Sequence, residues 1–373
     1  MAVQSGSPGL ADRASRADAG LCPVIDPLAP LALVSAAFGL IAVDALARPG
    51  MLSAGRARSV RGLAILLCAG MALLGAAVAV MGTWLPAAAL VVLLAGTLTL
   101  VSNIKHDVLG EPLVFSDFAL VGAVFRHPQF YLSALRPWHI AVLVLGFAAL
   151  VAVVLLLATD DKTSRLWGVI LAAGAAMSLR ALLAAAAWGP LAGNPDLERD
   201  VGAHGLIATL LVYWRHWTLQ APPPPPAHPA VAGEADALLI VVQCESFADP
   251  QALFGADEPP LPGLAAARSQ AWLAGRLAVS GFGAYTMRTE FGVIFGVPEQ
   301  MLGLHRFDPF LTAEKAAGWA LPNHLARGEW TSTFVHPHDM RFYGRDRLMP
   351  AAGFDRIVGE DAFPVPAAGE GRY

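Results

Sequence analysis

Three short segments in the second half of the chain place reactive side chains at the ends of expected secondary structure. The first is the apolar run 237–242, which is followed by Gln243-Cys244-Glu245-Ser246-Phe247. Short β-branched runs are typical of buried parallel strands, and ligands bind at the carboxyl ends of such strands. Glu245 therefore stands where a metal-binding or acid–base carboxylate is expected, although a glutamate after a strand is more often a solvated loop residue.

The second segment is a glycine-rich turn, Gly281-Phe282-Gly283-Ala284-Tyr285, that leads into an expected helix beginning near Thr286. Such a turn leaves backbone N–H groups at the helix N-terminus free to hold an anion. The Thr286 hydroxyl is a candidate nucleophile, and the alternative is that it only caps the helix. Arg288 lies in the first turn and is a candidate substrate-binding residue.

The third segment runs from Trp330 to Arg347. Residues 330–335 have the pattern of another buried strand, and His336-Pro337-His338-Asp339 follows at its carboxyl end. Arginines near aromatic residues then suit phosphate recognition, because the planar guanidinium binds two oxygens at once. His336, His338 and Arg345 are the candidates for substrate contact. For Arg341 and Arg347 the sequence favours surface charge pairs.

These segments follow a strongly apolar first half. The 373 residues are 56% hydrophobic and only 14% charged, against about 25% in soluble domains. A helix that crosses a bilayer needs about 20 apolar residues. The sequence predicts about five such spans, at 27–47, 62–82, 84–102, 138–158 and 166–189. The net charge of −4 does not suggest nucleic-acid binding, and three widely spaced cysteines suggest neither a disulfide framework nor a metal site.

The linear organisation predicted from these patterns has four parts: a flexible tail over 1–26, a transmembrane domain over 27–190, a juxtamembrane segment with a proline-rich linker over 191–235, and an α/β domain over 236–373. Five consecutive prolines, Pro222 to Pro226, form a stiff spacer. The polar loop 103–137 is expected to lie along the membrane surface, where it either lines a lipid-headgroup path or packs passively.

The Lys and Arg residues of the loops bear on which side of the membrane the C-terminal domain lies. The loops at 48–61 and 103–137 carry seven Lys and Arg residues, and the opposite side carries four. The positive-inside rule would then put the C-terminal domain in the cytoplasm.

Taken together, the three segments resemble the lipoteichoic acid synthase and phosphoglycerol transferase group of the alkaline phosphatase/sulfatase superfamily. Five spans before a soluble domain also match, as do three elements of the polar loop: Asn103-Ile104-Lys105, Glu111-Pro112-Leu113 and Phe115-Ser116-Asp117. The resemblance covers nearly the whole chain, and the order of the motifs makes it more specific than any one of them.

The resemblance implies a function and a set of roles. Glu245 and Thr286 would bind a divalent metal ion, typically manganese, and Thr286 would form a covalent phosphothreonine. Arg345 would hold the substrate phosphate. The donor would be an anionic phospholipid headgroup and the acceptor a glycan or lipid alcohol. The soluble domain would lie outside the cytoplasmic membrane, against the charge count, and the resemblance is preferred because the substrates lie outside.

One departure from the pattern is that the family's remaining ligands, an Asp-His pair and a further His, have no counterpart after His338. The α/β domain is therefore expected to be C-terminally incomplete and unable to complete the metal site, which would leave it inactive. A sulfatase-like hydrolase is an alternative, but the position of Thr286 holds neither Cys nor Ser and no proline stands two residues on. A non-catalytic membrane protein that keeps remnants of the site is the third reading.

Overall fold

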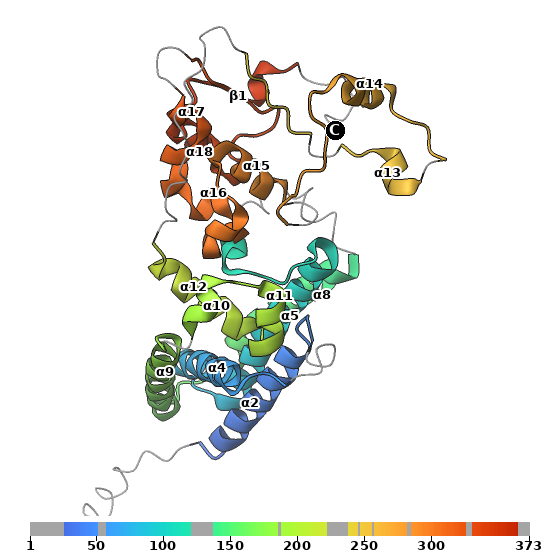
Figure 1. Cartoon of the computed structure of the whole chain (residues 1–373). Helices are drawn as coiled ribbons and strands as arrows, with labels where there is room; N and C mark the ends of the chain where they lie inside the picture. The colour runs from blue at the N-terminus through green and yellow to red at the C-terminus, as the bar shows by residue number, and fades with distance from the viewer. Residues whose placement is uncertain are drawn as a thin grey trace, which may run out of the picture. The chain divides into compact units, whose positions relative to one another are not determined.

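The computed structural model shows a mostly helical protein (Figure 1). It describes residues 26–50, 57–120, 137–185, 188–221, 238–244, 247–255, 257–281, 285–325 and 330–364. Glu245, Ser246, the turn residues 282–284 and the proline run lie outside this part of the chain.

Helices occupy all five segments that the hydropathy pattern predicts as spans. Their bounds are α2 (Ala29–Ala45), α4 (Val60–Met81), α5 (Trp84–Leu109), α8 (Pro137–Leu157) and α9 (Lys162–Leu183). Among the described residues, α4, α5 and α9 are long and apolar enough to cross a membrane. α2 is a shorter apolar helix of 17 residues, and α8 has 21 residues without Asp, Glu, Lys or Arg.

The end of α5 differs from the expectation. The helix was predicted to stop near residue 102, but it continues to Leu109. The polar residues of its last two turns keep helical backbone because Lys, His and Asp do not break a helix, so the polar loop begins only after α5 ends.

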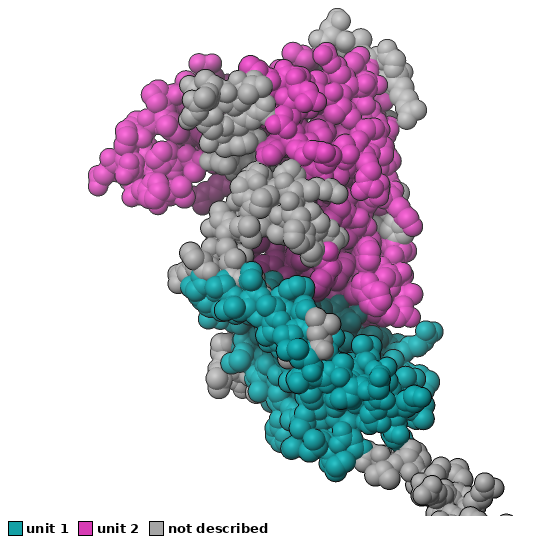
Figure 2. All heavy atoms as spheres, turned by 180° about the vertical axis from the view of Figure 1, so that it is seen from behind, with its two compact units in different colours: residues 1–104, 133–188, 197–212 teal, residues 105–132, 189–196, 213–373 magenta. Residues whose placement is uncertain are grey.

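The chain forms two compact units, which Figure 2 colours separately. Unit 1 comprises residues 1–104, 133–188 and 197–212, and unit 2 comprises 105–132, 189–196 and 213–373. Unit 2 therefore takes in the segment that directly follows the apolar part of α5.

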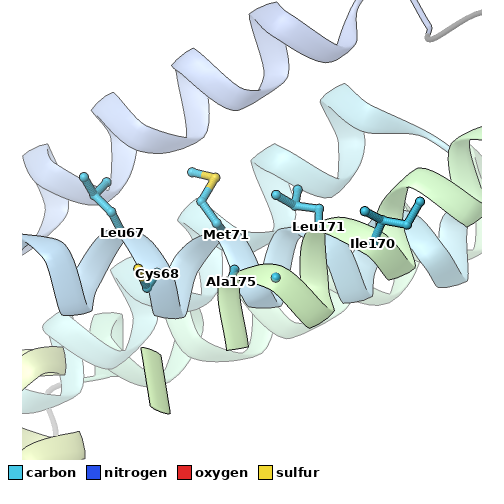
Figure 3. A pocket seen from close by; sticks show the side chains of 7 residues that line it. Leu67, Cys68, Met71, Ile170, Leu171 and Ala175 are labelled. Carbon is cyan, nitrogen blue, oxygen red and sulfur yellow. The ribbon is translucent and has the colours of Figure 1, made fainter. Parts of the chain in front are cut away.

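Unit 1 is built on a close packing of α4 against α9. A Cβ at Gly75 would clash with the backbone of Gly168 and Ala172, and a Cβ at Gly168 would lie 2.5 Å from the Ala79 nitrogen. Only glycine permits this approach, which is the small-residue packing typical of membrane helices. Beside the contact lies an open apolar groove (Figure 3), lined by Leu67, Cys68 and Met71 of α4 and by Ile170, Leu171, Gly174 and Ala175 of α9.

A buried ion pair ties the ends of several unit 1 helices together. Arg58 Nε donates to Asp44 Oδ2 at 3.1 Å, and both side chains are nearly inaccessible. Arg58 also donates to the carbonyls of Val201 and Gly202 at the end of α11 (Leu197–His204). Asp44 Oδ1 accepts from the Leu206 N–H, the first residue of α12 (Leu206–Leu219). A carboxylate near the end of a membrane span usually reaches water at the interface. Instead the two oxygens of Asp44 bind protein donors.

Unit 2 is a set of short helices around one apolar core. The further helices are α10 (Gly189–Gly193), α13 (Pro250–Phe254), α14 (Pro262–Gln270), α15 (Thr286–Phe295), α16 (Pro309–Thr312), α17 (Leu321–His324) and α18 (Arg345–Ala351). The 3₁₀ helices are η1 (Phe115–Leu120), η3 (Glu299–Met301), η4 (Gly303–Phe307), η5 (Glu314–Trp319), η6 (Phe342–Gly344) and η7 (Glu360–Ala362). The core is filled by side chains from α15, α16, η5 and α18, including Phe291, Phe295, Phe310, Leu348 and Met349.

The described part of unit 2 holds one small sheet. β1 (Thr333–Val335) pairs in parallel with β2 (Arg356–Val358), with Phe334 opposite Ile357. β1 confirms a strand within the segment 330–335, although it is shorter than predicted. α18 lies between the two strands in the chain, as the crossover of a parallel pair requires.

The prediction of a strand at 237–242 is wrong for the residues of this segment that the structure describes. Residues 238–244 form no regular element, and Leu238, Ile240 and Val242 are 85%, 70% and 75% exposed. A strand needs a neighbour to satisfy its backbone, and the described residues supply none here. An alkaline-phosphatase-like sheet is thus not shown beyond β1 and β2.

Candidate active site

Helix α15 places Thr286 at its first position, as the sequence predicts. Met287, Phe291 and Phe295 recur at a spacing of four and bury one face of the helix in the unit 2 core. Thr286 precedes Glu290 by one turn, so the two side chains share a neighbouring face. The N-cap residue is Tyr285, whose side chain makes no capping hydrogen bond. Thr286 is therefore a helical residue, half-buried, and not the N-cap.

Glu290 forms a buried ion pair with Arg345, the first residue of α18. Arg345 Nε donates to Glu290 Oε1 at 3.1 Å, and its Nη2 donates to Oε2. The guanidinium lies 5.3 Å from the ring centroid of Phe310 and 5.4 Å from that of Tyr343. Arg345, the predicted phosphate-binding residue, is thus only 2% exposed, and its guanidinium binds the Glu290 carboxylate.

The turn before Arg345 has an unusual backbone. Tyr343 has φ 59°, the left-handed region that a bulky residue rarely adopts, and Gly344 follows with φ 67°. These two residues form a kink at the end of η6, directly before Arg345 begins α18 and contacts Glu290 of α15. Strained backbone of this kind is concentrated at functional sites.

The two predicted histidines follow β1 and lie near the same arginine. The ring centroids of His336 and His338 are 6.3 Å apart. Burial, followed by the charges of Arg345 and His338, lowers the pKa of His336 to about 4. A neutral imidazole at pH 7 carries one N–H donor and one acceptor nitrogen. His338 Nδ1 accepts from the Asp339 N–H at 2.6 Å.

The structure therefore gathers part of the predicted site. Glu290 of α15 binds Arg345, whose charge acts on His336, and Thr286 is one turn away from Glu290 on the same helix. The sequence alone does not mark Glu290 as a site residue. Its role as a partner for Arg345 depends on a contact between positions 55 residues apart, which no local pattern reveals.

Arg288 lies in a separate polar cluster. Its Nη1 and Nη2 donate to the two carboxylate oxygens of Glu111 at 2.7 and 2.9 Å, and its guanidinium stacks 3.8 Å above the Tyr285 ring. Lys105 Nζ donates to Asp117 Oδ2 at 2.5 Å and lies over the same ring. The last turns of α5 and the loop that follows, which together were expected to lie on the membrane surface, thus supply one ammonium and two carboxylates to this cluster.

Asp308 completes this cluster and was not singled out in the sequence. Its Oδ1 accepts from the Leu311 N–H and caps α16, while its Oδ2 has no hydrogen-bond partner among the described residues. The side chain is 1% exposed, and this burial raises its pKa to about 7. The only local signal was Asp308-Pro309, the usual start of a short helix.

The metal site implied by the resemblance is not completed by the described residues. No group of three or more His, Cys, Asp or Glu side chains gathers there in a geometry that could hold an ion. Glu245, one of the two predicted ligands, lies outside the described residues, and Thr286 alone offers a single hydroxyl. No chemical step is therefore derived through a metal.

The comparisons with known proteins bear on the class of this chain. No protein-family model matches it, and no solved structure matches it. The capsular polysaccharide biosynthesis protein RkpI of Rhizobium meliloti is 31% identical over 307 residues. The match covers 73% of this chain and 54% of RkpI, so the chain spans about half the length of the relative it matches.

Proposed function

We propose that this chain is a membrane-anchored protein of cell-envelope polysaccharide biosynthesis that transfers a phosphoryl-linked headgroup, of the phosphoglycerol type, from an anionic phospholipid to an alcohol acceptor. The observation that carries the proposal is the convergence of α15, Arg345 and His336. The name of RkpI and the apolar helices α4, α5 and α9 support the envelope setting. The proposal includes five spans and an extracytoplasmic unit 2.

The chemistry assigned to Thr286 is a double displacement. Its hydroxyl oxygen attacks the donor phosphorus and loses its proton, and the bond from phosphorus to the lipid alcohol breaks as that alcohol takes up a proton. The acceptor hydroxyl, a glycan or lipid alcohol, then attacks the phosphothreonine and releases Thr286 with its proton restored. Atoms and charges balance over the two steps.

The phosphoryl oxygens would be bound by groups at the same end of the site. His336 is neutral and offers an N–H donor, and His338 and Arg288 remain further candidates. Arg345 would exchange its Glu290 partner for the phosphate, which suits its planar fork equally well. A divalent ion, proposed to be manganese and bound partly by Glu245 and Thr286, would lower the pKa of the Thr286 hydroxyl.

A non-catalytic membrane protein is the competing function. It is favoured by the missing three-residue metal group within the described residues. A sulfatase-like ester hydrolase is the weaker alternative, because position 286 is a threonine and position 288 an arginine.

Turnover on phosphatidylglycerol vesicles with manganese separates these functions, measured as release of diacylglycerol. A longer relative that carries the Asp-His ligands should be active, should form a modified threonine at the position matching Thr286, and should lose activity as the alanine variant. Replacing the residue that matches the exposed Thr333 by alanine is the control. An active Thr286-equivalent alanine variant would sink the covalent mechanism.

A further inference from the structure

The apolar groove between α4 and α9 lies within two helices that are long and apolar enough to cross a membrane. It has a volume of about 390 Å³, and its lining is apolar apart from the thiol of Cys68 (Figure 3). Ligand sites in proteins have volumes of about 300–1,000 Å³. The surroundings of a groove at this place are the acyl chains of the bilayer.

The two helices that form the groove run antiparallel. A Cβ at Gly75 would meet the backbone nitrogen of Ala172, and a Cβ at Gly168, one turn earlier in α9, would meet that of Ala79, one turn later in α4. The first turn of α4 and the last turn of α9 therefore lie at the same end of the pair.

Arg61 stands in the first turn of α4, on the same face as Cys68, because seven residues make almost two full turns. Its side chain is exposed and forms no hydrogen bond or ion pair within the described part of the chain. The helical rise puts Cys68 about 10 Å deeper in the membrane than Arg61. Since each headgroup layer is roughly 5–8 Å deep, a guanidinium at headgroup level stands above a groove at acyl-chain level.

The charges at the opposite end of the pair are balanced. There Arg165 donates to Asp160 at 3.1 Å, and Asp161 caps α9 beside Lys162. Two carboxylates thus accompany two cations, whereas the guanidinium of Arg61 has no acidic partner among the described residues. An anion is therefore attracted to the end of the groove that Arg61 occupies.

We propose that the groove holds one acyl chain of an anionic phospholipid and that Arg61 binds the phosphate of the same molecule. A phospholipid supplies an apolar chain and an anion together, and a phosphate suits the guanidinium fork. A helix from a second copy of the chain would fill the groove but leave Arg61 without an anion. The proposal concerns binding alone, so it does not depend on whether the lipid then donates its headgroup in the reaction proposed above.

Photo-crosslinking tests where the lipid binds. The full chain is reconstituted in phosphatidylcholine nanodiscs that contain a small fraction of phosphatidylglycerol with a diazirine in one acyl chain. After illumination, mass spectrometry should find lipid adducts at the groove residues of α4 and α9. The matched phosphatidylcholine probe should give about fivefold fewer adducts there, because one arginine near the headgroups contributes roughly that factor to the binding of an anionic lipid.

Four variants make the test specific to the groove and to Arg61. Gly174→Leu should lower the groove adducts at least fivefold, because it fills the groove, and nothing lies within 4 Å of the new Cβ. Ala173→Leu, on the exposed outer face of α9, should leave them unchanged. Arg61→Gln should remove the preference for phosphatidylglycerol. Arg180→Gln should keep it, because Arg180 lies at the same end but on the face of Ala173. An unchanged thermal aggregation temperature in detergent shows that each variant folds.

Three outcomes would overturn the proposal. Adducts spread evenly around α9, Ala173 included, would mean that lipid surrounds the helix without a site. Equal adducts from the two probes would mean that Arg61 selects no headgroup. A dimer that Gly174→Leu abolishes, with no lipid adduct in the groove, would assign the groove to a second copy of the chain.

Discussion

Both carboxylate oxygens of Glu290 accept hydrogen bonds from the guanidinium of Arg345 within unit 2. Arg345 Nε lies 3.1 Å from Glu290 Oε1, and both side chains are less than one-tenth exposed. Removing one member of such a pair leaves an unpaired buried charge and costs about 3–5 kcal/mol. Arg345→Met should therefore destabilise unit 2, because Glu290 is left as a buried carboxylate without its counter-charge. Lowering of the thermal transition of the full chain in detergent is the measurement.

The stability effect must be separated from a role in phosphate binding. The double variant Arg345→Met with Glu290→Met removes both charges and should recover most of the stability, since an apolar pair of similar size is often neutral. If Arg345 binds phosphate, the matching double variant of an active relative stays folded and inactive. Full activity in that background would assign Arg345 a structural role only.

Breaking the ion pair between Arg288 and Glu111 should also destabilise unit 2. Glu111→Gln removes the carboxylate that binds both Nη atoms of the 4% exposed Arg288 guanidinium, and we expect a loss of about 3 kcal/mol. Asp339→Asn is the matched control, because it removes a carboxylate from Arg341, whose side chain is 70% exposed. Exposed pairs of that kind contribute roughly 0–1 kcal/mol. Equal effects of the two variants on thermal unfolding would contradict the assignment.

The sequence predicted the helices of unit 1 well and the sheet of unit 2 poorly. Apolar runs of about 20 residues specify a helix locally, because its hydrogen bonds close within the segment. The run 238–242 is equally clear as a pattern, but a strand takes its hydrogen bonds from another segment. β1 forms because Arg356–Val358 lies beside it.

For the candidate site too, the sequence predicted local features and did not predict contacts between distant segments. The residue types at Thr286, His336 and Arg345 and their place at element ends were readable from the sequence. The partners were not, because Glu290 with Arg345 and Glu111 with Arg288 are pairs 55 and 177 residues apart. The ion pair of Asp44 with Arg58 was missed for another reason: a single carboxylate near a helix end is usually solvated.

Gly75 should be intolerant of any larger side chain. Its missing Cβ would overlap the backbone of α9, so Gly75→Leu must push α4 and α9 apart. Gly174→Leu on α9 is the matched control, because nothing lies within 4 Å of a Cβ there. We expect the first variant to lower the thermal aggregation temperature in detergent by several degrees and the second to leave it unchanged. Similar behaviour of both would argue against close packing at Gly75.

The orientation of unit 2 is testable with fusions after Tyr373. The proposed function places unit 2 outside the cytoplasmic membrane, whereas the loops carry seven Lys and Arg residues against four on the other side. A reporter that folds only outside the cytoplasm should be active, and one that fluoresces only inside should be dark. The reverse pattern would support the charge count and contradict the proposed site of action.

Asp308 should make unit 2 less stable as the pH rises from 4 to 8. Burial raises its pKa from the ordinary 3.8 to about 7, so the folded state keeps a proton that the unfolded state has lost. The stability that depends on this proton is fully present below pH 4, falls between pH 4 and 7, and is gone above pH 7. Each pKa unit corresponds to about 1.4 kcal/mol, so a rise from 3.8 to about 7 makes the loss on the order of 4 kcal/mol.

Asp308→Asn isolates this effect from those of other groups, such as His336, whose lowered pKa acts in the opposite direction. The amide keeps an oxygen to accept from the Leu311 N–H and carries no charge at any pH in this range. Relative to the parent chain, the variant should therefore gain stability steadily between pH 4 and 7 and hold that gain at pH 8. Asp361→Asn, at an exposed position, is the control and should follow the parent at every pH. If the thermal transitions of parent and Asp308→Asn stay parallel from pH 4 to 8, Asp308 is charged in the folded protein and has a partner that compensates its burial.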